Sequence, residues 1–380
     1  MNISKFEKCS NCGACYNICP KDAIAVEKEG LFYSLSVDSD LCIDCGLCSN
    51  ICPVNNDFET MIPLYACAGW HKDQEVVLNS SSGGVFFGIA NKIIEEGGIV
   101  FGAEYSEDCK TVVFSSTDET DISKLLRSKY VESQIELSFR KVKVELEKGR
   151  KVLFCGTPCQ VAGLCRFLEK PYDHLITCDF ACGGLPSHAL YQKYLSSLEE
   201  KYGSSIKSVD FRPKTHGWKR YAVRICFENG KVYNRLGVED KYLKSFLYGK
   251  CTVRDYCLEC KFSDNHASDI TIADFWLHEK LSSLRNENGI SLILCNSSKG
   301  KDILEVVGEQ FVFAELDLDS ATYNHKKTET SENTIRRRQA FLMLCDEKNL
   351  RTACETILPC SFKNKLKNRV ARIICRKRRG

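Results

Sequence analysis

Cysteine is the residue type in this chain with the clearest chemical purpose, because two groups of cysteines repeat one spacing. Each group reads C-x2-C-x2-C-x3-C-P, and the chain of 380 residues contains 24 cysteines in all. Thiolates at this pitch wrap around a [4Fe–4S] cube, and the fourth thiolate of each run reaches the other cube. The spacing therefore predicts two iron–sulfur clusters with crossed ligands. The first set is Cys9, Cys12, Cys15 and Cys52, and the second set is Cys42, Cys45, Cys48 and Cys19.

The repeated unit recurs after 33 residues, and Pro20 and Pro53 end its two halves. Zinc knuckles are the competing interpretation, but zinc sites rarely use three cysteines at this pitch and lack the repeated Cys-Pro end. We therefore expect residues 1–58 to form a bacterial 2x[4Fe–4S] ferredoxin domain. Such a domain is complete at this length, so the rest of the chain must contain the site that uses the electrons.

A further set of cysteines lies beyond residue 150. Cys159 follows a Gly-Thr-Pro turn, Cys182 follows an expected strand, and Cys257 and Cys260 form a C-x2-C pair. Strand ends at one edge of an α/β sheet converge, so the loops after two such strands can bring Cys159 and Cys182 side by side. The four thiols are compatible with one tetrahedral site, for either a [4Fe–4S] cluster or zinc. A nucleophilic Cys159 is disfavoured, because its local sequence offers no base.

The elements after the cysteine repeat are those of a mixed α/β body. Strand–turn–helix units recur over 151–170 and 174–203, which favours some parallel sheet. Residues 208–234 are antiparallel in character, with an Asn-Gly hairpin turn. We expect an α+β or α/β body in two parts, 65–150 and 151–320, followed by a helical, basic extension over 321–380.

Several segments of this body resemble the coenzyme F-420 hydrogenase/dehydrogenase beta-subunit family, and they occur in that family's order. They read FCGTPCQVAGL, CGGLPS, FRPKTHGWK and CLECKFSDNHASDITIADFW, while SSSGGVFFGIANKIIEEGGIVFGAEY and LLRSKYVES resemble the family's N-terminal part. The resemblance covers about 65–320, with the ferredoxin domain fused in front, and nothing after about 320.

The resemblance implies an FAD enzyme with a [4Fe–4S] cluster of its own in the body. The family's ligands correspond to Cys159, Cys182, Cys257 and Cys260. The family pattern does not require cysteine at positions 155, 178 and 251, where we expect small buried residues. Cys155 or Cys178 would be the substitute ligand if this assignment is wrong.

The flavin site expected from the resemblance is not of the Rossmann type, because the chain contains no G-x-G-x-x-G. Ser81, Ser82, Gly83 and Gly84 precede an expected helix, where backbone N–H groups and the helix dipole favour a pyrophosphate. A serine run at a helix start is equally typical of an N-cap. Ser128, Lys129 and Tyr130 would add a cation and an aromatic contact, or form a surface loop. Asp269 and Asp274 could hold the flavin or a cluster loop through hydrogen bonds, or cap short turns, and they receive no catalytic role. His188 and His216 are candidate proton donors only because they lie in family-matching segments, since a lone histidine is more often structural. The catalytic residues are unknown.

The function that the resemblance implies is an iron–sulfur flavoprotein oxidoreductase. It would pass electrons between ferredoxin-type clusters and a two-electron carrier through FAD. The partner would be a redox protein or a small hydride carrier or substrate, of the F-420 type or linked to cell-surface polysaccharide synthesis. Two alternatives stay open. One is a non-catalytic electron-transfer subunit that docks a partner enzyme, and the other is an interaction module without flavin whose inner thiols bind zinc.

The distribution of charge and the two ends of the chain predict which partners and which location the protein has. Residues 363–380 carry nine Lys or Arg and no acid, so the rest of the chain sums to −6 against +3 for the whole. A body of this charge is not a nucleic-acid-binding surface. The N-terminus lacks the apolar core of a secretory signal, so we expect a cytoplasmic protein. Phe362, Leu366, Val370, Ile373 and Ile374 share one helical face, which is typical of peripheral contact with an anionic membrane, of docking to an acidic partner, or of a solvated terminus.

Overall fold

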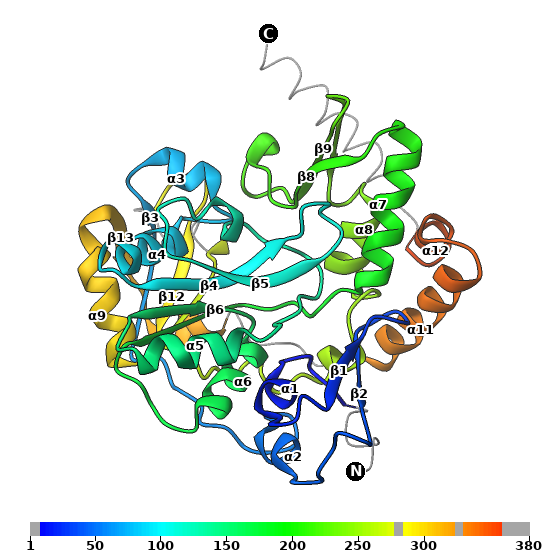
Figure 1. Ribbon diagram of the computed structural model, residues 1–380. Helices are drawn as coiled ribbons and strands as arrows, with labels where there is room; N and C mark the ends of the chain where they lie inside the picture. Colours follow the sequence, from blue (N-terminus) through cyan, green and yellow to red (C-terminus); the bar gives the residue numbers. More distant parts are fainter. Residues whose placement is uncertain (1–7, 277–283, 324–329, 359–380) are drawn as a thin grey trace.

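The computed structural model describes residues 8–276, 284–323 and 330–358 (Figure 1). Its centre is an eight-stranded mixed sheet with the order β13-β3-β12-β11-β7-β6-β4-β5. The four strands β11, β7, β6 and β4 run parallel, and antiparallel pairs lie on both sides of them. Both expected parts of the body contribute strands: β3 (Tyr65–His71), β4 (Ile99–Tyr105), β5 (Val112–Thr117), β6 (Val152–Cys155), β7 (Leu175–Phe180), β11 (Ile270–Asp274), β12 (Ser291–Cys295) and β13 (Phe311–Glu315).

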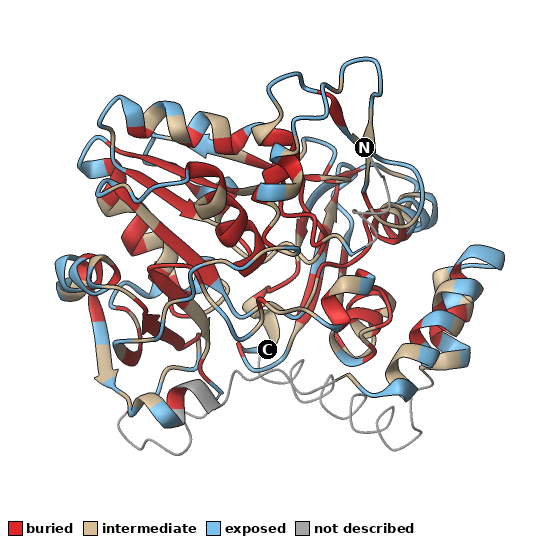
Figure 2. Ribbon diagram, turned by 90° about the horizontal axis from the view of Figure 1, so that it is seen from below, coloured by how far each residue is buried: buried red, intermediate tan, exposed pale blue. Residues whose placement is uncertain are grey.

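Both faces of the large sheet are buried, as Figure 2 shows. Side chains alternate between the faces along each strand, so Val100 and Leu153 enter one apolar cluster while Phe101 and Phe154 enter the other. Helices α4 (Val85–Glu95) and α9 (Ser298–Val307) cover the first face. Helices α5 (Ser138–Glu147) and α6 (Pro158–Leu168) cover the second. The helices expected after Gly84 and after Pro158 are thus confirmed, and the mixed α/β class with them.

The N-terminal cysteine repeat forms two short helices and a hairpin. These are α1 (Ala14–Ile18), β1 (Ile24–Glu27), β2 (Ser34–Val37) and α2 (Leu47–Ile51). They lie beside α5 and α6 at the bottom of Figure 1. Tyr16 and Ile51 share an apolar cluster with Phe139 and Leu164, so the repeat packs directly on the helical layer of the body.

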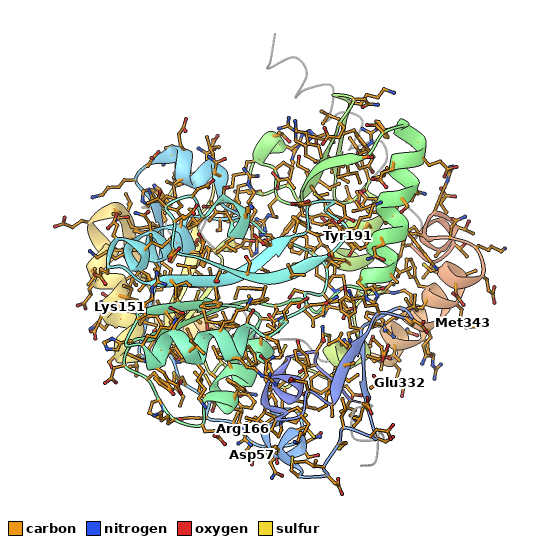
Figure 3. All side chains as sticks on the ribbon, viewed as in Figure 1. Asp57, Lys151, Arg166, Tyr191, Glu332 and Met343 are labelled. Atoms are coloured by element: carbon orange, nitrogen blue, oxygen red, sulfur yellow. The ribbon has the colours of Figure 1, made fainter. Side chains whose placement is uncertain are left out.

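A second, smaller sheet lies beyond the edge strand β5, next to the long helix α7 (His188–Tyr202), on which Figure 3 labels Tyr191. It has the order β10-β9-β8. The predicted Asn-Gly turn joins two of its strands, with Phe227 N–H donating to the Lys231 carbonyl over 3.0 Å and a left-handed Gly230. The strands are β8 (Ile206–Asp210), β9 (Ala222–Phe227) and β10 (Val232–Leu236).

The remaining elements are short helices and the start of the C-terminal extension. Helices α11 (Glu332–Glu347) and α12 (Leu350–Ile357) fit the helical character expected after residue 320. The basic tail at 363–380 lies outside the described residues. No helix in the described ranges is long and apolar enough to cross a membrane. The others are α3 (Gln74–Asn79), η2 (Ser123–Leu125), η3 (Lys214–His216), α8 (Lys241–Leu243), the π-helical turn η4 (Lys244–Tyr248), η5 (Asp255–Leu258), η7 (Gly308–Gln310) and α10 (Leu318–Tyr323).

Candidate functional site

The first cysteine set surrounds a small cavity at the N-terminal end of α1. The cavity is lined by Cys9, Cys12, Cys15 and Cys52, so the fourth thiol does come from the other run of the repeat. Gly13 makes the loop possible, because its left-handed φ of 86° starts α1 immediately after Cys12. The structure therefore brings together the four thiols expected to hold the first cluster.

The second set surrounds a matching cavity on the other side of the repeat. Its lining includes Cys19, Cys42, Cys45 and Cys48, again with one thiol from the opposite run. Gly46 likewise has a left-handed backbone conformation immediately before α2, with a φ of 75°. Unlike the first set, this one reaches the surface: Cys45 is exposed, and Leu41, Ile43 and Leu47 beside it are 40–58% exposed.

The inner set begins at the helix start that follows β6. Thr157 and Gln160 form a capping box, and Pro158 occupies the first turn of α6. Cys159 is therefore fixed at a helix N-terminus, where the dipole favours a thiolate. The Thr157 hydroxyl lies 3.1 Å from the Cys159 sulfur.

The other three inner thiols come from two separate loops. Strands β6 and β7 are parallel neighbours, so the loops that carry Cys159 and Cys182 leave the same edge of the sheet. Burial raises the pKa of Cys159 well above its usual value, and the nearby Cys260 and Cys182 thiols raise it further. Burial likewise raises the pKa of Cys257 to about 12, with Cys182 and Cys260 adding to the effect. The four inner thiols thus lie together.

All three cysteine sets fit an iron–sulfur cluster in their chemistry. Buried thiols that repel one another as thiolates are costly unless a cationic group lies between them, and iron supplies that charge. In the first set, burial raises the pKa of Cys15 well above its usual value, and Cys12, Cys9 and Cys52 each add to the rise. Within the described ranges, no three His, Cys, Asp or Glu side chains close around a single metal ion.

The first and inner sets are close neighbours. The Cys159 thiol lies 3.7 Å from the Ser10 carbonyl oxygen, in the loop of the first set. A Cβ atom on Gly163, one turn further along α6, would lie 3.2 Å from the Cβ and Sγ atoms of Cys12. Cys12 also contributes to the raised pKa of Cys159, after burial and other inner thiols. The ferredoxin loop and helix α6 therefore meet with almost no space between them.

Two arginines of the body fasten the cysteine repeat. Arg140 of α5 donates to the carbonyl oxygens of Asn17 and Cys19, each over 2.7 Å, where α1 ends. Arg166 of α6 donates to the Asp57 carbonyl over 3.1 Å, and the two residues lie next to each other in Figure 3. Cations at free helix carbonyls are favourable, so these contacts hold the repeat at one position on the body.

The two segments expected to bind flavin lie side by side, although 47 residues separate them. The Ser81 and Ser128 hydroxyls are 2.9 Å apart. Ser82 and Gly83, however, use their donors within the fold: the Ser82 hydroxyl donates to Ile290, and Gly83 N–H donates to Ser291. Gly84 has a φ of 90° and begins α4.

The segment FRPKTHGWK and the end of β11 complete this cluster. Asp274 was expected either to hold the flavin or a cluster loop or to cap a turn, whereas Arg212 was not among the expected flavin residues. Arg212 makes a two-pronged contact with Asp274, at 2.7 and 3.1 Å, and donates to the Ser81 carbonyl over 3.1 Å. Trp218 and Tyr221 donate to the same Asp274 carboxylate. The available signal was the family resemblance, because Arg212, Lys214 and Asp274 all stand in family-like segments.

Two lysines in this cluster have unusually low pKa values. Burial lowers the pKa of Lys129 to about 7, although Cys155 and the acids Glu104 and Asp210 lie nearby. Burial also lowers the pKa of Lys214 to about 7, and the nearby cations Arg212 and Arg127 lower it further. Their Nζ atoms donate to backbone carbonyls, that of Leu126 for Lys129 and that of Ser82 for Lys214. An anion placed here would stabilise both ammonium groups, so the residues fit a phosphate-bearing cofactor.

The aromatic residue Tyr130 connects this cluster to the inner thiols. Its ring lies 5.2 Å from that of Phe246, and its hydroxyl accepts from Arg212 over 3.3 Å. A Cβ on Gly183, which follows Cys182, would lie 3.6 Å from the Phe246 ring. The flavin-type cluster and the inner thiols are therefore separated by one layer of aromatic side chains.

Several other sequence candidates have structural partners. Asp269 is buried and accepts from Thr177 and Ser297, so it joins β7 to the start of α9. His188 is buried against Glu132, and His216 lies in the turn η3. Cys178 and Cys251 are buried, as expected of non-ligands, whereas Cys155 is half-buried beside Cys178 in the β6–β7 register.

Comparison with known proteins gives two family matches. Residues 149–320 match the family defined by the C terminus of the coenzyme F420 hydrogenase/dehydrogenase beta subunit. Residues 8–56 match the "4Fe-4S dicluster domain". These matches confirm the family resemblance expected from the sequence and the ferredoxin repeat at the N-terminus.

Among solved structures, the chain is similar to one from the F420-reducing [NiFe] hydrogenase complex of Methanosarcina barkeri, studied by xenon derivatization. The identity is 17% and the TM-score is 0.47, over 75% of this chain and 94% of that one. No curated protein matches the sequence.

Proposed function

We propose that this chain, which joins a 4Fe–4S dicluster domain to the C-terminal domain of coenzyme F420 hydrogenase/dehydrogenase beta subunits, is an FAD-dependent iron–sulfur oxidoreductase. The observation that carries the proposal is the placement of the inner thiols. They lie between the first ferredoxin set, through Ser10 and Cys12, and the flavin-type cluster, through Phe246.

The residues divide into three kinds of role. When bound, the clusters would exchange single electrons and the flavin would convert them into pairs. The twelve thiols of the three sets would hold iron, and Cys45 is the exposed one among them. Ser81, Ser128, Lys129 and Lys214 would hold the flavin's phosphates, while Tyr130 would lie on the side of the inner thiols. Ser82, Gly83 and Gly84 would shape that loop rather than donate to the cofactor.

For the substrate, we propose only a chemical class. It would be a carrier that takes or gives two electrons, such as a deazaflavin of the F420 type or a substrate in cell-surface polysaccharide synthesis. A redox partner protein would contact the exposed face around Cys45. For the tail at 363–380, we propose peripheral contact with the cytoplasmic face of a membrane, on its sequence pattern alone.

The deciding experiment measures metal and cofactor in protein purified without oxygen. We expect about twelve irons with matching sulfide, no zinc and one FAD per chain, since three cubes hold four irons each. About eight irons with one zinc and no flavin would support the interaction module instead. Full loading without turnover of any two-electron carrier, unless a partner enzyme is added, would support the electron-transfer subunit.

A pair of cysteine substitutions tests the inner set. Cys159→Ser is expected to remove about a third of the iron, because an inner cluster would lose one of four ligands. Cys155→Ser, four residues earlier and outside the set, is the matched control and should keep the full iron content. Equal loss in both variants, or loss only in Cys155→Ser, would mean that the ligand assignment is wrong.

A further inference from the structure

A buried arginine lies between the first and inner thiol sets. Arg254 is 8% exposed and stands three residues before Cys257, at the start of η5. Its Nη1 atom lies 3.4 Å from the Cys9 carbonyl oxygen, and its Nη2 atom donates to the Tyr33 carbonyl. One side chain of the body therefore reaches both the ligand loop and the hairpin of the ferredoxin domain.

Arg254 contacts both thiol sets. Its guanidinium lies at the Cys9 carbonyl of the first set, and its own carbonyl oxygen accepts from the N–H of Cys257 in the inner set over 3.0 Å. The Nε atom of Arg254 is buried and has no hydrogen-bond partner among the described residues. This buried positive group therefore has one donor that is not used within the described residues.

A buried carboxylate balances this arginine. Glu132 is fully buried, and its Oε2 atom lies 3.2 Å from Arg254 Nη2. Its Oε1 atom accepts from the Tyr33 N–H over 3.1 Å and lies 2.7 Å from His188 Nδ1. The His188 ring stacks on Tyr33 with the centroids 3.8 Å apart, so the carboxylate is held by both domains.

We propose that Arg254 is a shared positioning charge that sets the reduction potentials of the first ferredoxin cluster and the inner cluster together, with Glu132 opposing it at the first. An added electron makes a cluster more negative, so a nearby fixed cation stabilises the reduced form and a nearby anion destabilises it. The inner half of this inference rests on the proposed function. The first half rests only on the dicluster domain.

The test is a redox titration followed by electron paramagnetic resonance on the loaded protein. Arg254→Gln is expected to shift the potentials of the first and inner clusters to lower values and to leave the second cluster unchanged. Glu132→Gln is expected to shift the first cluster in the opposite direction, because the cation loses its counter-charge. The double variant should return the first cluster toward the wild-type potential. A merely structural role would not produce opposite signs.

The controls separate charge from folding and from the proposed function. Arg150→Gln removes an arginine that pairs with Asp118 and Glu145, and it should move no potential. If the Arg254→Gln protein does not take up its clusters, Glu132→Gln still tests the proposal. An unchanged or lowered reduction potential of the first cluster in Glu132→Gln would overturn it. An unchanged first potential in a loaded Arg254→Gln would overturn it as well. A missing inner cluster would refute the proposed function and leave the result at the first cluster standing.

Discussion

At the scale of single residues, Lys129 and Lys214 are the side chains of the flavin-type cluster that best fit an anion. Burial lowers the pKa of each to about 7 from an ordinary value of 10.5. Arg127 and Arg212 lie close by, and their charges are matched by Asp210 and Asp274. Among the described residues, the two lysines have no carboxylate within ion-pair distance, so their charges are the ones left for a ligand.

The affinity for FAD should therefore depend on pH. Below about pH 7 both lysines are protonated in the flavin-free protein, whereas above it they lose their protons. A bound pyrophosphate would then have to draw them back, so affinity falls as the pH rises. We expect binding at least about tenfold weaker at pH 8.5 than at pH 6.5, measured by fluorescence titration of deflavinated protein.

Substitution of one lysine tests the cause of that dependence. Lys129→Met should weaken FAD binding about tenfold at pH 6.5 and flatten the pH profile, since a charge-assisted hydrogen bond contributes about 1.5–3 kcal/mol. Lys124→Met, in the same segment but exposed, is the matched control and should bind as the wild type does. A wild-type affinity that does not change with pH would show that these lysines do not contact the phosphates.

At the scale of elements, the contact between α6 and the first ferredoxin loop decides how near the two thiol sets lie. Gly163 is the residue of closest approach, and an added Cβ would also lie 3.3 Å from the Cys12 carbonyl oxygen. The Thr157 cap and Pro158 fix the start of the same helix, so Cys159 cannot move independently of this contact. The spacing of the two sets is therefore a property of helix packing.

A larger residue at position 163 should separate the two elements. Gly163→Val is expected to destabilise the packed N-terminal repeat by about 1–3 kcal/mol through overpacking and to lower the iron content. The measurements are urea unfolding, followed by the visible absorption of the clusters, and iron per chain. Gly308→Val is the control, because a Cβ there meets nothing within 4 Å. Equal effects of the two variants would contradict the packing argument.

At the scale of the whole molecule, the thiol sets and the flavin-type cluster follow one another through the fold. The second thiol set reaches the solvent at Cys45, the first and inner sets each have two buried and two half-buried thiols, and the inner set lies between the first set and the flavin-type cluster. Arg140 and Arg166 hold the N-terminal repeat against the body, so this order does not depend on a mobile tether. Under the proposed function, this arrangement would give a route within one chain between a redox partner at the surface and a substrate at the flavin.

The basic tail gives a prediction for the intact protein. Deleting 361–380 should release the protein from membranes at moderate salt, because nine cations and five apolar residues would be lost together. Cell fractionation at two salt concentrations provides the measurement. Ile373→Asp keeps the cations but breaks the apolar face, so it separates the two contributions. Fractionation that is the same with and without the tail would contradict membrane contact.

The cysteine repeat, the main helices and the hairpin could be predicted from the sequence because their determinants are local. C-x2-C-x2-C encloses one turn of backbone, a glycine run precedes α4, and Thr-Pro starts α6. The family resemblance added the inner ligand set and FAD, which no local pattern contains and which stay predictions. The local pattern was misleading about Ser82 and Gly83, which were expected to offer hydrogen-bond donors to a pyrophosphate. Their donors are used instead by residues 208 positions away.

Several contacts depended on tertiary structure: Arg212 and Lys214 meet the loop at 81–82, Asp274 pairs with Arg212, and Arg254 and Glu132 meet the ferredoxin hairpin. These partners are 62 to 221 residues apart along the chain. Which of them meet is set by the order of strands in the large sheet and by the packing of α5 and α6 on the repeat. The sequence by itself specified the thiol spacing and the local elements, because those depend on backbone within a few residues. The fold specified which charges face those thiols, because burial and long-range pairing exist only after the layers have packed.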